Sequence, residues 1–392
     1  MMRRLLPTVC LLTVLALLTA VVPAGALISL AQGQSAVSTV PFDTVDRAPT
    51  EESQKNTDVV IEPLEVHTAS GESFGYGFST MNPNNNEAHE LGFNWVKVYD
   101  VPAEPQPVKV LYRVKADAFD WYNLSAFEWQ VRQLAEAYGD NIDAYEIGNE
   151  VNTYFEWGQP PNASRYVDVL CTARYAILQV DPTAEIISAG LAPVGRISGV
   201  WDGHAGHNVS VQDEREYLKE FLNANGQLCF DAIGYHPMGF RADYDAEPDV
   251  DGGTPETDCS DGFCFRGVEK IYEIIQADGL DDLKIWATEV GWIVEPADEC
   301  IGHPSWQGRY WQIVSAQKQA ENLVGAFKYA RFHYPWMEAL FVFNLDFVTA
   351  PYYDECEQMS HYSVYGRPAA DALGAMSKVI RSTYLPLVLR SP

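Results

Sequence analysis

The hydrophobic positions of the chain form short runs rich in β-branched and aromatic residues, which alternate with longer stretches of helical period. Eight of these runs are predicted strands: Ser73–Thr80, Asn94–Asp100, Val108–Lys115, Ala144–Glu150, Glu185–Leu191, Asp231–His236, Lys284–Glu289 and Ala339–Asp346. The stretches between most of them are predicted helices: Ala126–Tyr138, Ser164–Val180, Glu214–Asn225, Val268–Ala277, Ser315–Phe332 and, after the last strand, Pro368–Ile380.

Strand–helix alternation repeated eight times predicts the α/β class and, within it, a (β/α)8 TIM barrel. A single domain with this fold is expected over residues 63–383. A doubly wound open sheet is the alternative, but such sheets usually begin with Gly-x-Gly-x-x-Gly, which this sequence lacks. The connection over residues 81–93 is short and poorly helical, so it departs from the pattern.

The N-terminus has the pattern of a signal peptide. Arg3 and Arg4 are followed by an apolar run from Leu5 to Val22 and by the small residues Ala24-Gly25-Ala26. We therefore expect a signal peptide over residues 1–26, cleavage near Ala26 and a secreted protein. An uncleaved membrane anchor is the alternative.

The segments that flank the predicted domain differ from it in composition. Residues 27–62 are rich in Ser, Thr, Gln, Asp and Pro without sustained periodicity, which predicts a flexible polar linker. Residues 384–392 form a short apolar tail that either packs as a last strand or attaches the protein to a surface.

Seven cysteines are present, and Cys10 falls within the predicted signal peptide. The remaining even number in an exported chain indicates disulfides. Cys259 and Cys264 lie in one loop and are expected to pair locally. For the others we expect the pairs Cys171–Cys229 and Cys300–Cys356, although six cysteines allow 15 connectivities.

The formal net charge of −28 argues against two classes of partner. A strongly acidic surface repels the phosphates of nucleic acids and anionic membranes, whereas it tolerates a neutral substrate. Aromatic residues make up 12% of the chain, which suits both sugar binding and a large core. We expect no metal, no cofactor and a monomer.

Two predicted strands end in glutamate. The fourth ends Tyr145-Glu-Ile-Gly-Asn-Glu150, and the seventh ends Ile285-Trp-Ala-Thr-Glu289. Active sites of TIM barrels form at the carboxyl ends of the strands, so both carboxyl groups are expected at one mouth. Cleavage of a glycosidic bond needs two carboxyl groups, one to protonate the leaving oxygen and one to attack the anomeric carbon or activate water. An isolated glutamate at a strand end is more often a solvated charge.

The sequences Glu-Ile-Gly-Asn-Glu-Val-Asn and Thr-Glu-Val-Gly-Trp resemble clan A of the glycoside hydrolases, the 4/7 barrels. With Gly-Tyr-His-Pro in strand six, they are most similar to family 39 and its relatives. The resemblance implies a retaining enzyme, with Glu150 as general acid/base and Glu289 as nucleophile. It further implies that Asn149 holds the sugar 2-hydroxyl and that Tyr235 donates to the nucleophile.

Other candidate substrate-binding residues come from strand parity. With Ile233 facing the helices, the alternation of strand six turns His236 into the barrel. Strand eight lacks the tryptophan that serves as a sugar platform in many clan members, so Asn344 is a candidate contact there. Trp292, just beyond Glu289, is the better platform candidate, and Trp157 and Trp306 are further ones.

Charged residues inside predicted strands must be paired, because burial of a lone charge is costly. If Val96 and Val98 face the helices, Lys97 and Tyr99 face inward. By the same parity Arg113 faces inward, and we expect Lys97 and Arg113 to form a network with Glu146. A cation nearby keeps Glu289 ionised, as a nucleophile requires.

Two other functions remain open. The first is a glycan-binding protein that has lost activity on the same scaffold, and the second is a transglycosylase. The acidic loop that begins at Asp245 suits calcium by residue type, but a solvated charge run is the favoured interpretation. No Gly-x-Ser-x-Gly or His-Glu-x-x-His motif occurs, which argues against serine hydrolases and zinc proteases.

Overall fold

The computed structural model describes residues 74–84, 86–115, 123–204, 207–248, 258–259, 262–351 and 353–378. The predicted signal peptide, linker and C-terminal tail lie outside these residues, as does most of the acidic loop. Among the described residues, no helix has both the length and the apolar character that crossing a membrane requires.

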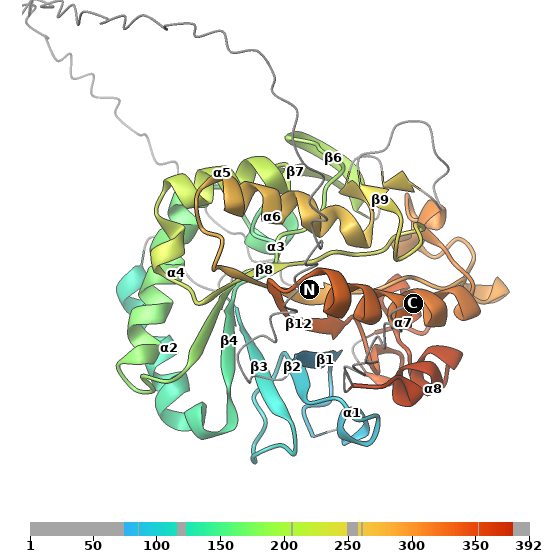
Figure 1. Ribbon diagram of the computed structural model, residues 1–392, viewed down its shortest axis with the longest axis horizontal. Helices are drawn as coiled ribbons and strands as arrows, with labels where there is room; N and C mark the ends of the chain where they lie inside the picture. The colour runs from blue at the N-terminus through green and yellow to red at the C-terminus, as the bar shows by residue number, and fades with distance from the viewer. Residues whose placement is uncertain are drawn as a thin grey trace, which may run out of the picture. The chain divides into compact units, whose positions relative to one another are not determined.

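Eight parallel strands close into a barrel in the order β1-β12-β11-β8-β5-β4-β3-β2, which confirms the predicted TIM barrel (Figure 1). Their bounds are β1 Gly75–Thr80, β2 Trp95–Val98, β3 Lys109–Val114, β4 Ala144–Ile147, β5 Glu185–Ser188, β8 Ala232–Tyr235, β11 Lys284–Val290 and β12 Met337–Val342. Each matches one predicted strand. Just beyond β12, the peptide bond between Phe343 and Asn344 is cis.

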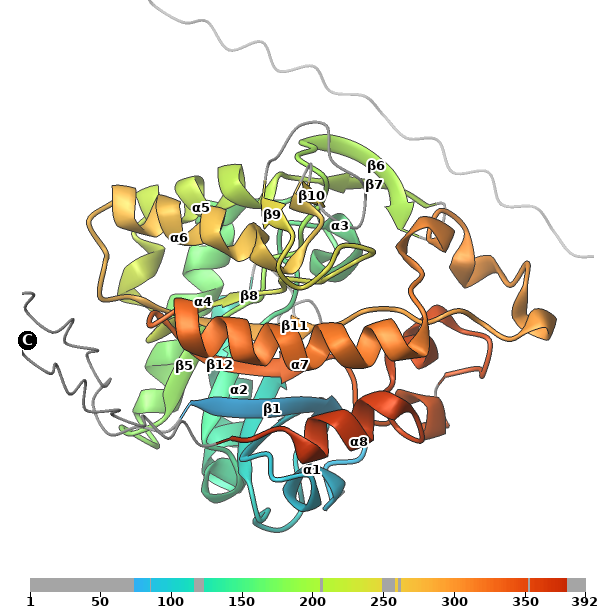
Figure 2. The ribbon, with the colours of Figure 1, turned by 45° about the vertical axis from the view of Figure 1, so that its right-hand side comes forward.

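Helices surround the barrel where the periodicity predicts them. Their bounds are α2 Leu124–Tyr138, α4 Ala163–Leu178, α5 Glu214–Asn223, α6 Val268–Ala277, α7 Ala316–His333 and α8 Pro368–Ala375. Figure 2 shows α7 and α8 side by side across β1 and β12. Asn123, Asn162, Asp213 and Ser315 cap the N-termini of α2, α4, α5 and α7 by accepting a hydrogen bond from a backbone N–H.

Several short elements lie in the loops and were not predicted. They are α1 Glu87–Glu90, α3 Tyr154–Trp157, the hairpin β6 Gly199–His204 with β7 His207–Val211, and the short pair β9 Glu247–Pro248 with β10 Asp258–Cys259. The hairpin contacts α3, because Thr153 bridges to Val211. Apart from α1, which connects β1 to β2, these elements lie in loops that follow β4, β5 and β8 at the carboxyl end of the barrel.

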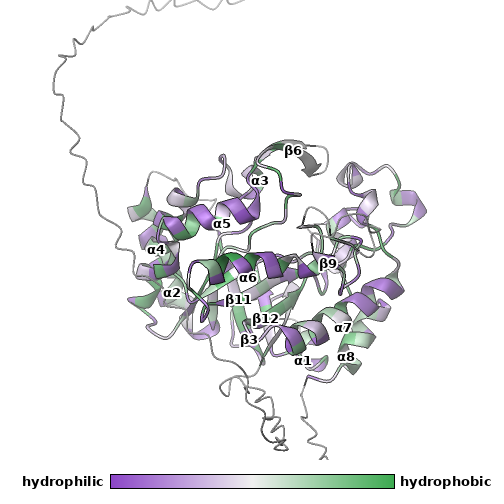
Figure 3. Cartoon of the chain, turned by 45° about the horizontal axis from the view of Figure 1, so that its top comes forward, coloured by the Kyte–Doolittle hydropathy of each residue, from purple (hydrophilic) through white to green (hydrophobic). Residues whose placement is uncertain are grey.

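Strand parity separates two apolar layers. Side chains that point into the barrel form one cluster: Trp95, Leu111, Ala144, Ile187, Ala232, Trp286, Ala339 and Phe341. Their neighbours along the strands, such as Val96 and Ile233, belong to the larger core between strands and helices. In Figure 3 the helices carry both hydrophobic and hydrophilic residues, as helices that cover a barrel must.

Three disulfides join the cysteines as predicted: Cys171–Cys229, Cys259–Cys264 and Cys300–Cys356. The first ties α4 to the segment before β8. The third ties the loop after β11 to the loop after β12, so two walls of the barrel mouth are covalently joined.

Candidate active site

Glu150 follows strand β4 on a sharp turn of the backbone. β4 ends at Ile147, and Gly148 has a φ of 88°, a left-handed conformation that glycine adopts without steric cost. Glu150 itself has a φ of 37°, which is uncommon for a residue with a Cβ. Its backbone N–H donates to the carbonyl oxygen of Gly190 at 2.9 Å. The turn therefore holds the Glu150 carboxyl at the carboxyl end of the barrel.

Two buried polar side chains hold this turn in place. The hydroxyl of Tyr166 in α4 donates to the Ile147 carbonyl at 2.7 Å and accepts from the Ala189 N–H at 2.6 Å. The amide of Asn152 donates to the Ala192 carbonyl at 2.8 Å and accepts from the Ala192 N–H at 2.9 Å. Both residues join the segment after β4 to the segment after β5.

Glu289 lies near the end of β11, where the pairing with β12 is irregular. Ala287 pairs with Leu340 and Val290 pairs with Val342, so β11 has one residue more than β12 between these pairs. Such a bulge changes the direction of the side chains beside it. The side chain of Glu289 is 9% exposed, whereas that of Glu150 is 26% exposed.

Lys97 of β2 is fully buried and joins two carboxylates. Its Nζ lies 2.7 Å from Glu146 Oε2 and 2.9 Å from Glu289 Oε1. The predicted pairing of Lys97 with Glu146 is confirmed, but Arg113 departs from the prediction. Arg113 forms its ion pair with Glu156 of the loop helix α3, at 3.5 Å.

His236 points into the barrel, as the parity of its strand predicts. Its Nδ1 lies 2.9 Å from Glu150 Oε1 and 3.7 Å from Glu289 Oε2. One carboxylate oxygen of each glutamate and one ring nitrogen of His236 all lie within 4.8 Å of one another. The two carboxyl groups that the sequence predicts to act together are therefore neighbours.

Gly190 makes room for this arrangement. A Cβ at Gly190 would overlap the His236 ring and would lie 2.7 Å from Thr288 Oγ1. The Gly190 N–H also donates to Glu146 Oε1 at 3.3 Å. A residue without a side chain is therefore required where the segment after β5 passes the imidazole.

The electrostatics of the cluster favour an ionised Glu289. Burial alone would raise the pKa of Glu289, but the charges of His236 and Lys97 lower it below its ordinary value. Burial would likewise lower the pKa of His236, yet the Glu289 charge and the hydrogen bond to Glu150 raise it. A carboxylate and an imidazolium thus stabilise each other in this site.

The same three side chains, Glu150, His236 and Glu289, have the donor atoms of a metal site. Two contacts argue against this use. The Lys97 ammonium bonds to Glu289 at 2.9 Å, and His236 Nδ1 already bonds to Glu150 at 2.9 Å. A divalent cation would have to displace or repel both groups, so the arrangement suits proton transfer better.

A third carboxyl group at the mouth, Glu156, was not predicted from the sequence. It lies on α3, where its N–H donates to Thr153 Oγ1 at 3.4 Å. The signal was available, since Thr153-x-x-Glu156 has the form of a capping box. Burial raises the pKa of Glu156 to about 7, while Arg113 and a hydrogen bond from Asn149 act in the opposite direction. Asn149, next to Glu150, has a buried Oδ1 without a hydrogen-bond partner within the protein.

The predicted tryptophan platforms are not available for sugar. Trp292 is fully buried, and its indole N–H donates to the Ala242 carbonyl at 2.7 Å. Trp306 is also fully buried, and Trp157 is 1% exposed. These rings complete the packing of the loops, because each finds apolar neighbours that the sequence order does not reveal.

Two further residues predicted to contact the substrate, Asn344 and Tyr235, are not positioned to do so. The Asn344 amide is buried, donating to the Met359 carbonyl at 3.0 Å and accepting from the Phe347 N–H at 3.1 Å. Tyr235 has the parity opposite to that of His236, so it packs in the core between barrel and helices, near Glu214. The structure therefore does not bring Tyr235 to Glu289.

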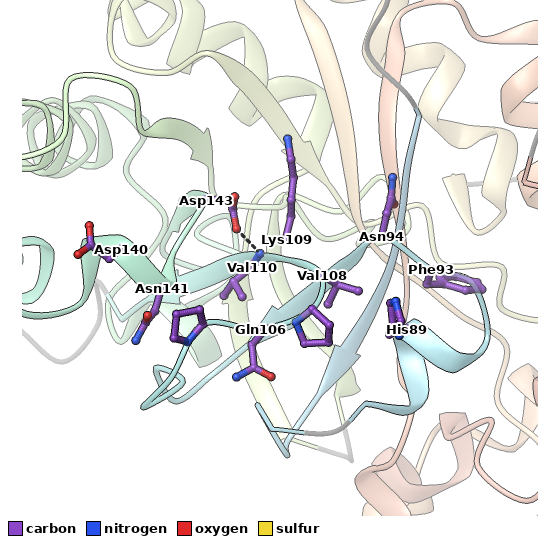
Figure 4. A pocket seen from close by; sticks show the side chains of 12 residues that line it. His89, Phe93, Asn94, Gln106, Val108, Lys109, Val110, Asp140, Asn141 and Asp143 are labelled. Atoms are coloured by element: carbon purple, nitrogen blue, oxygen red, sulfur yellow. Dashed lines mark hydrogen bonds between the residues drawn. The ribbon is translucent and has the colours of Figure 1, made fainter.

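A cavity of about 500 Å³ lies at the other end of the barrel (Figure 4). It is lined by residues that precede or begin β2, β3 and β4, among them Asn94, Lys109 and Asp143. The carboxylate of Asp143 accepts from the Val110 N–H at 2.8 Å within it. The predicted site residues do not line this cavity.

The sequence matches no known protein-family model, and no curated protein shows significant sequence similarity to it. Similarity to solved structures is extensive but distant. A glucosidase from Croceicoccus marinus aligns with a TM-score of 0.51 and 13% identity, over 78% of this chain and 68% of that one. The GH53 catalytic domain of Ignisphaera aggregans aligns with a TM-score of 0.48 and 15% identity, over 73% of this chain and 86% of that one.

A third neighbour was crystallised with a sugar ligand. It is a GH128 endo-β-1,3-glucanase from Amycolatopsis mediterranei in complex with laminaritriose, with a TM-score of 0.44 and 12% identity, over 78% of this chain and 100% of that one. At 13% identity the likeness to the glucosidase supports the barrel fold alone. The resemblance to family 39 stays a prediction.

Proposed function

We propose that this protein is a retaining glycoside hydrolase that acts outside the cell on an oligo- or polysaccharide, with β-linked sugars as the expected class. The observation that carries this proposal is the pair Glu150 and Glu289, which approach within 4.8 Å at the carboxyl end of a TIM barrel. Retaining enzymes keep their two carboxyl groups about 5–5.5 Å apart, whereas inverting enzymes leave room for a water between them.

The different surroundings of the two carboxyl groups support different roles. Glu289 is held ionised by Lys97 and His236, as a nucleophile must be. It attacks the anomeric carbon while the bond to the leaving oxygen breaks, and Glu150 gives its proton to that oxygen. Glu150 then takes a proton from water, whose oxygen attacks the anomeric carbon and releases Glu289.

Other residues assist in positioning. His236, bonded to Glu150, fixes the direction of that carboxyl group. We expect Asn149, whose buried Oδ1 has no hydrogen-bond partner within the protein, to accept a hydrogen bond from the sugar 2-hydroxyl. Action outside the cell is supported by the three disulfides and by the predicted signal peptide, since disulfides persist in oxidising compartments.

The test is turnover on a panel of aryl β-glycosides and of β-linked polysaccharides, β-1,3-glucans included, with Glu150→Ala and Glu289→Ala beside the wild type. We expect both variants to lose activity by a factor on the order of 10⁴. Azide should restore part of the activity of Glu289→Ala and give a glycosyl azide of inverted configuration. A product of inverted configuration from the wild type would contradict the retaining mechanism.

An inactive glycan-binding protein is the second candidate, because strand eight lacks the tryptophan of the clan pattern and has Asn344 as its candidate contact. Such a protein would keep its function in the Glu289→Ala variant. Binding to a polysaccharide without turnover by the wild type, unchanged in Glu289→Ala, would favour this candidate. Transfer to added sugar acceptors, measured at high acceptor concentration, separates a transglycosylase from a hydrolase.

A further inference from the structure

Three aromatic rings from the loops after β8 and β11 form one stack. The rings of Phe240 and Trp311 lie 5.5 Å apart and almost parallel, with an interplanar angle of 6°. Phe263 packs against both, at 4.6 Å from Phe240 and 5.2 Å from Trp311. Phe240 is 7% exposed, whereas Trp311 is 42% exposed. Trp311 is thus backed by the buried Phe240 ring and the partly buried Phe263 ring, and it leaves an aromatic surface open.

This stack is connected to the carboxyl pair. Phe240 follows His236 by four residues, on the same loop. Trp311 lies on a single 3-10 turn, Tyr310–Gln312, whose Gln312 accepts a hydrogen bond from the Tyr362 hydroxyl at 3.4 Å. Phe263 lies against Gly195 in the loop after β5, since a Cβ at Gly195 would come within 2.7 Å of its ring. The three rings therefore adjoin the loop of His236, which bonds to Glu150, and the loop after β5, whose neighbour β4 leads to Glu150.

A second aromatic group lies toward Glu289. Tyr353 stacks on Phe347 with ring centres 5.2 Å apart and an interplanar angle of 8°, and Tyr99 meets Phe347 edge-on at 5.7 Å. Tyr99 follows Lys97 by two residues, and Lys97 Nζ lies 2.9 Å from Glu289 Oε1. The two aromatic groups come from different loops, one associated with each carboxyl group.

We propose that Trp311, supported by Phe240 and Phe263, is the platform for the sugar ring on the leaving-group side of the scissile bond. The proposal rests on the glycosidase function proposed above. The leaving sugar carries the oxygen that Glu150 protonates, so it must lie on the Glu150 side. The apolar C–H face of a pyranose packs on an open indole surface, which an indole backed by fixed rings offers at little entropic cost.

The experiment compares a substrate that has a leaving-group sugar with one that has none. Laminaripentaose supplies such a sugar, whereas β-glucosyl fluoride has a single atom as its leaving group. If the panel identifies another sugar, the matching pentasaccharide and fluoride are used. Both are assayed with the wild type, Trp311→Ala, Trp311→Phe and Trp129→Ala, where Trp129 is a tryptophan on α2 that is 63% exposed.

We expect Trp311→Ala to lower kcat/KM on the pentasaccharide about tenfold and to leave kcat/KM on the fluoride within twofold. Trp311→Phe should retain most of the activity on both substrates, and Trp129→Ala should match the wild type. Equal losses on both substrates, or no loss on the pentasaccharide, would overturn the platform.

Failure of the proposed function has a different signature. A wild type that turns over no member of the panel contradicts the glycosidase function itself. Affinity electrophoresis in gels that contain soluble β-glucan then tests whether Trp311 binds sugar. Retardation of the wild type and of Trp129→Ala, lost in Trp311→Ala, supports a sugar platform. Equal mobility of the wild type and Trp311→Ala overturns it.

Discussion

The two ends of the barrel are built from the same eight strands but from different interior side chains. Toward the amino end the interior is apolar, with Trp95, Trp286 and Phe341 in contact. Toward the carboxyl end it holds a buried ammonium, an imidazole and carboxylates. In β2 the change takes two residues, from Trp95 to Lys97. These apolar side chains at the amino end stabilise the barrel, and their burial offsets the free-energy cost of desolvating the charged groups at the carboxyl end.

The largest effect is expected from Lys97→Met, which makes the carboxyl end resemble the amino end. Glu146 and Glu289 would then be buried without their shared cation, and we expect a loss of about 3–5 kcal/mol in stability. The pKa of Glu289 should rise, so the acidic limb of the pH profile of kcat/KM should move to higher pH. Activity at a fixed acidic pH should fall about tenfold for each unit of that shift.

Urea denaturation and the pH profile of kcat/KM measure the two effects of Lys97→Met separately. The double variant Lys97→Met with Glu146→Gln is the control, because it also removes one of the two carboxylates that lose their cation. We expect it to recover part of the stability and part of the shifted acidic limb, because without Lys97 the Glu146 charge also raises the pKa of Glu289. An unchanged acidic limb in the single variant would show that Lys97 does not set the ionisation of Glu289.

Phe341→Ala tests the amino end. Phe341 is fully buried in the barrel interior, so its truncation should cost about 3–5 kcal/mol of stability. Well below the melting temperature, kcat/KM should stay within about threefold of the wild type, because catalysis depends on the other end. A large loss of kcat/KM in a folded Phe341→Ala variant would contradict this division of the barrel.

Glu214 offers a carboxyl group at the carboxyl end without a buried lysine beside it. Burial raises its pKa from 4.5 to about 7, against the hydrogen bonds of the Glu214 and Val194 N–H groups. Because the folded-state pKa is above the unfolded one, stability should fall as pH rises from about 4.5 to 7 and then level off. Glu214→Gln should remove this slope and be more stable at pH 8 by up to about 3 kcal/mol. Urea denaturation of both proteins at pH 5 and pH 8 measures the difference.

The smallest effect is expected from Glu156→Gln. The pKa of Glu156 is raised to about 7, so its charge appears near neutral pH within reach of Glu150 and Glu289. The wild-type profile of kcat/KM should show a change of slope near pH 7 that is a few-fold in size and absent from Glu156→Gln. Glu128→Gln, on the outer helix α2, is the matched control. Identical pH profiles of kcat/KM for the wild type and Glu156→Gln would show that the charge of Glu156 does not influence the reaction.

The fold could be predicted because barrel strands and helices have distinct hydrophobic periods. The alternation of side chains along a strand correctly predicted that Lys97 and His236 point into the barrel. A residue next to outward-facing valines or isoleucines in a strand must point inward. The parity of Tyr235 argued against its predicted role, and the structure agrees with the parity. Pairings were less predictable, because the choice of Arg113 between Glu146 and Glu156 depends on where a loop helix lies.

The aromatic residues of the loops show where sequence reasoning ends. Trp292 and Trp306 were chosen for their position next to site motifs, yet both are covered by segments distant in sequence. Trp311 was overlooked, although Gly308-Arg-Tyr-Trp-Gln has no apolar periodicity that would bury it. Whether a loop ring is open depends on tertiary neighbours, which no local pattern encodes.

The contact of Gly190 with the His236 ring has a consequence for how such chains can diverge. Substitution at either position is constrained by the other, so the two should change together or remain fixed. Among homologous chains, a side chain larger than hydrogen at position 190 should occur only where the imidazole at 236 has been replaced by something smaller. A natural homologue with histidine at position 236 and alanine at position 190 would show that the backbone can shift to accommodate the larger side chain. Covariation between positions 190 and 236 therefore tests this contact from sequences alone, without a further structure.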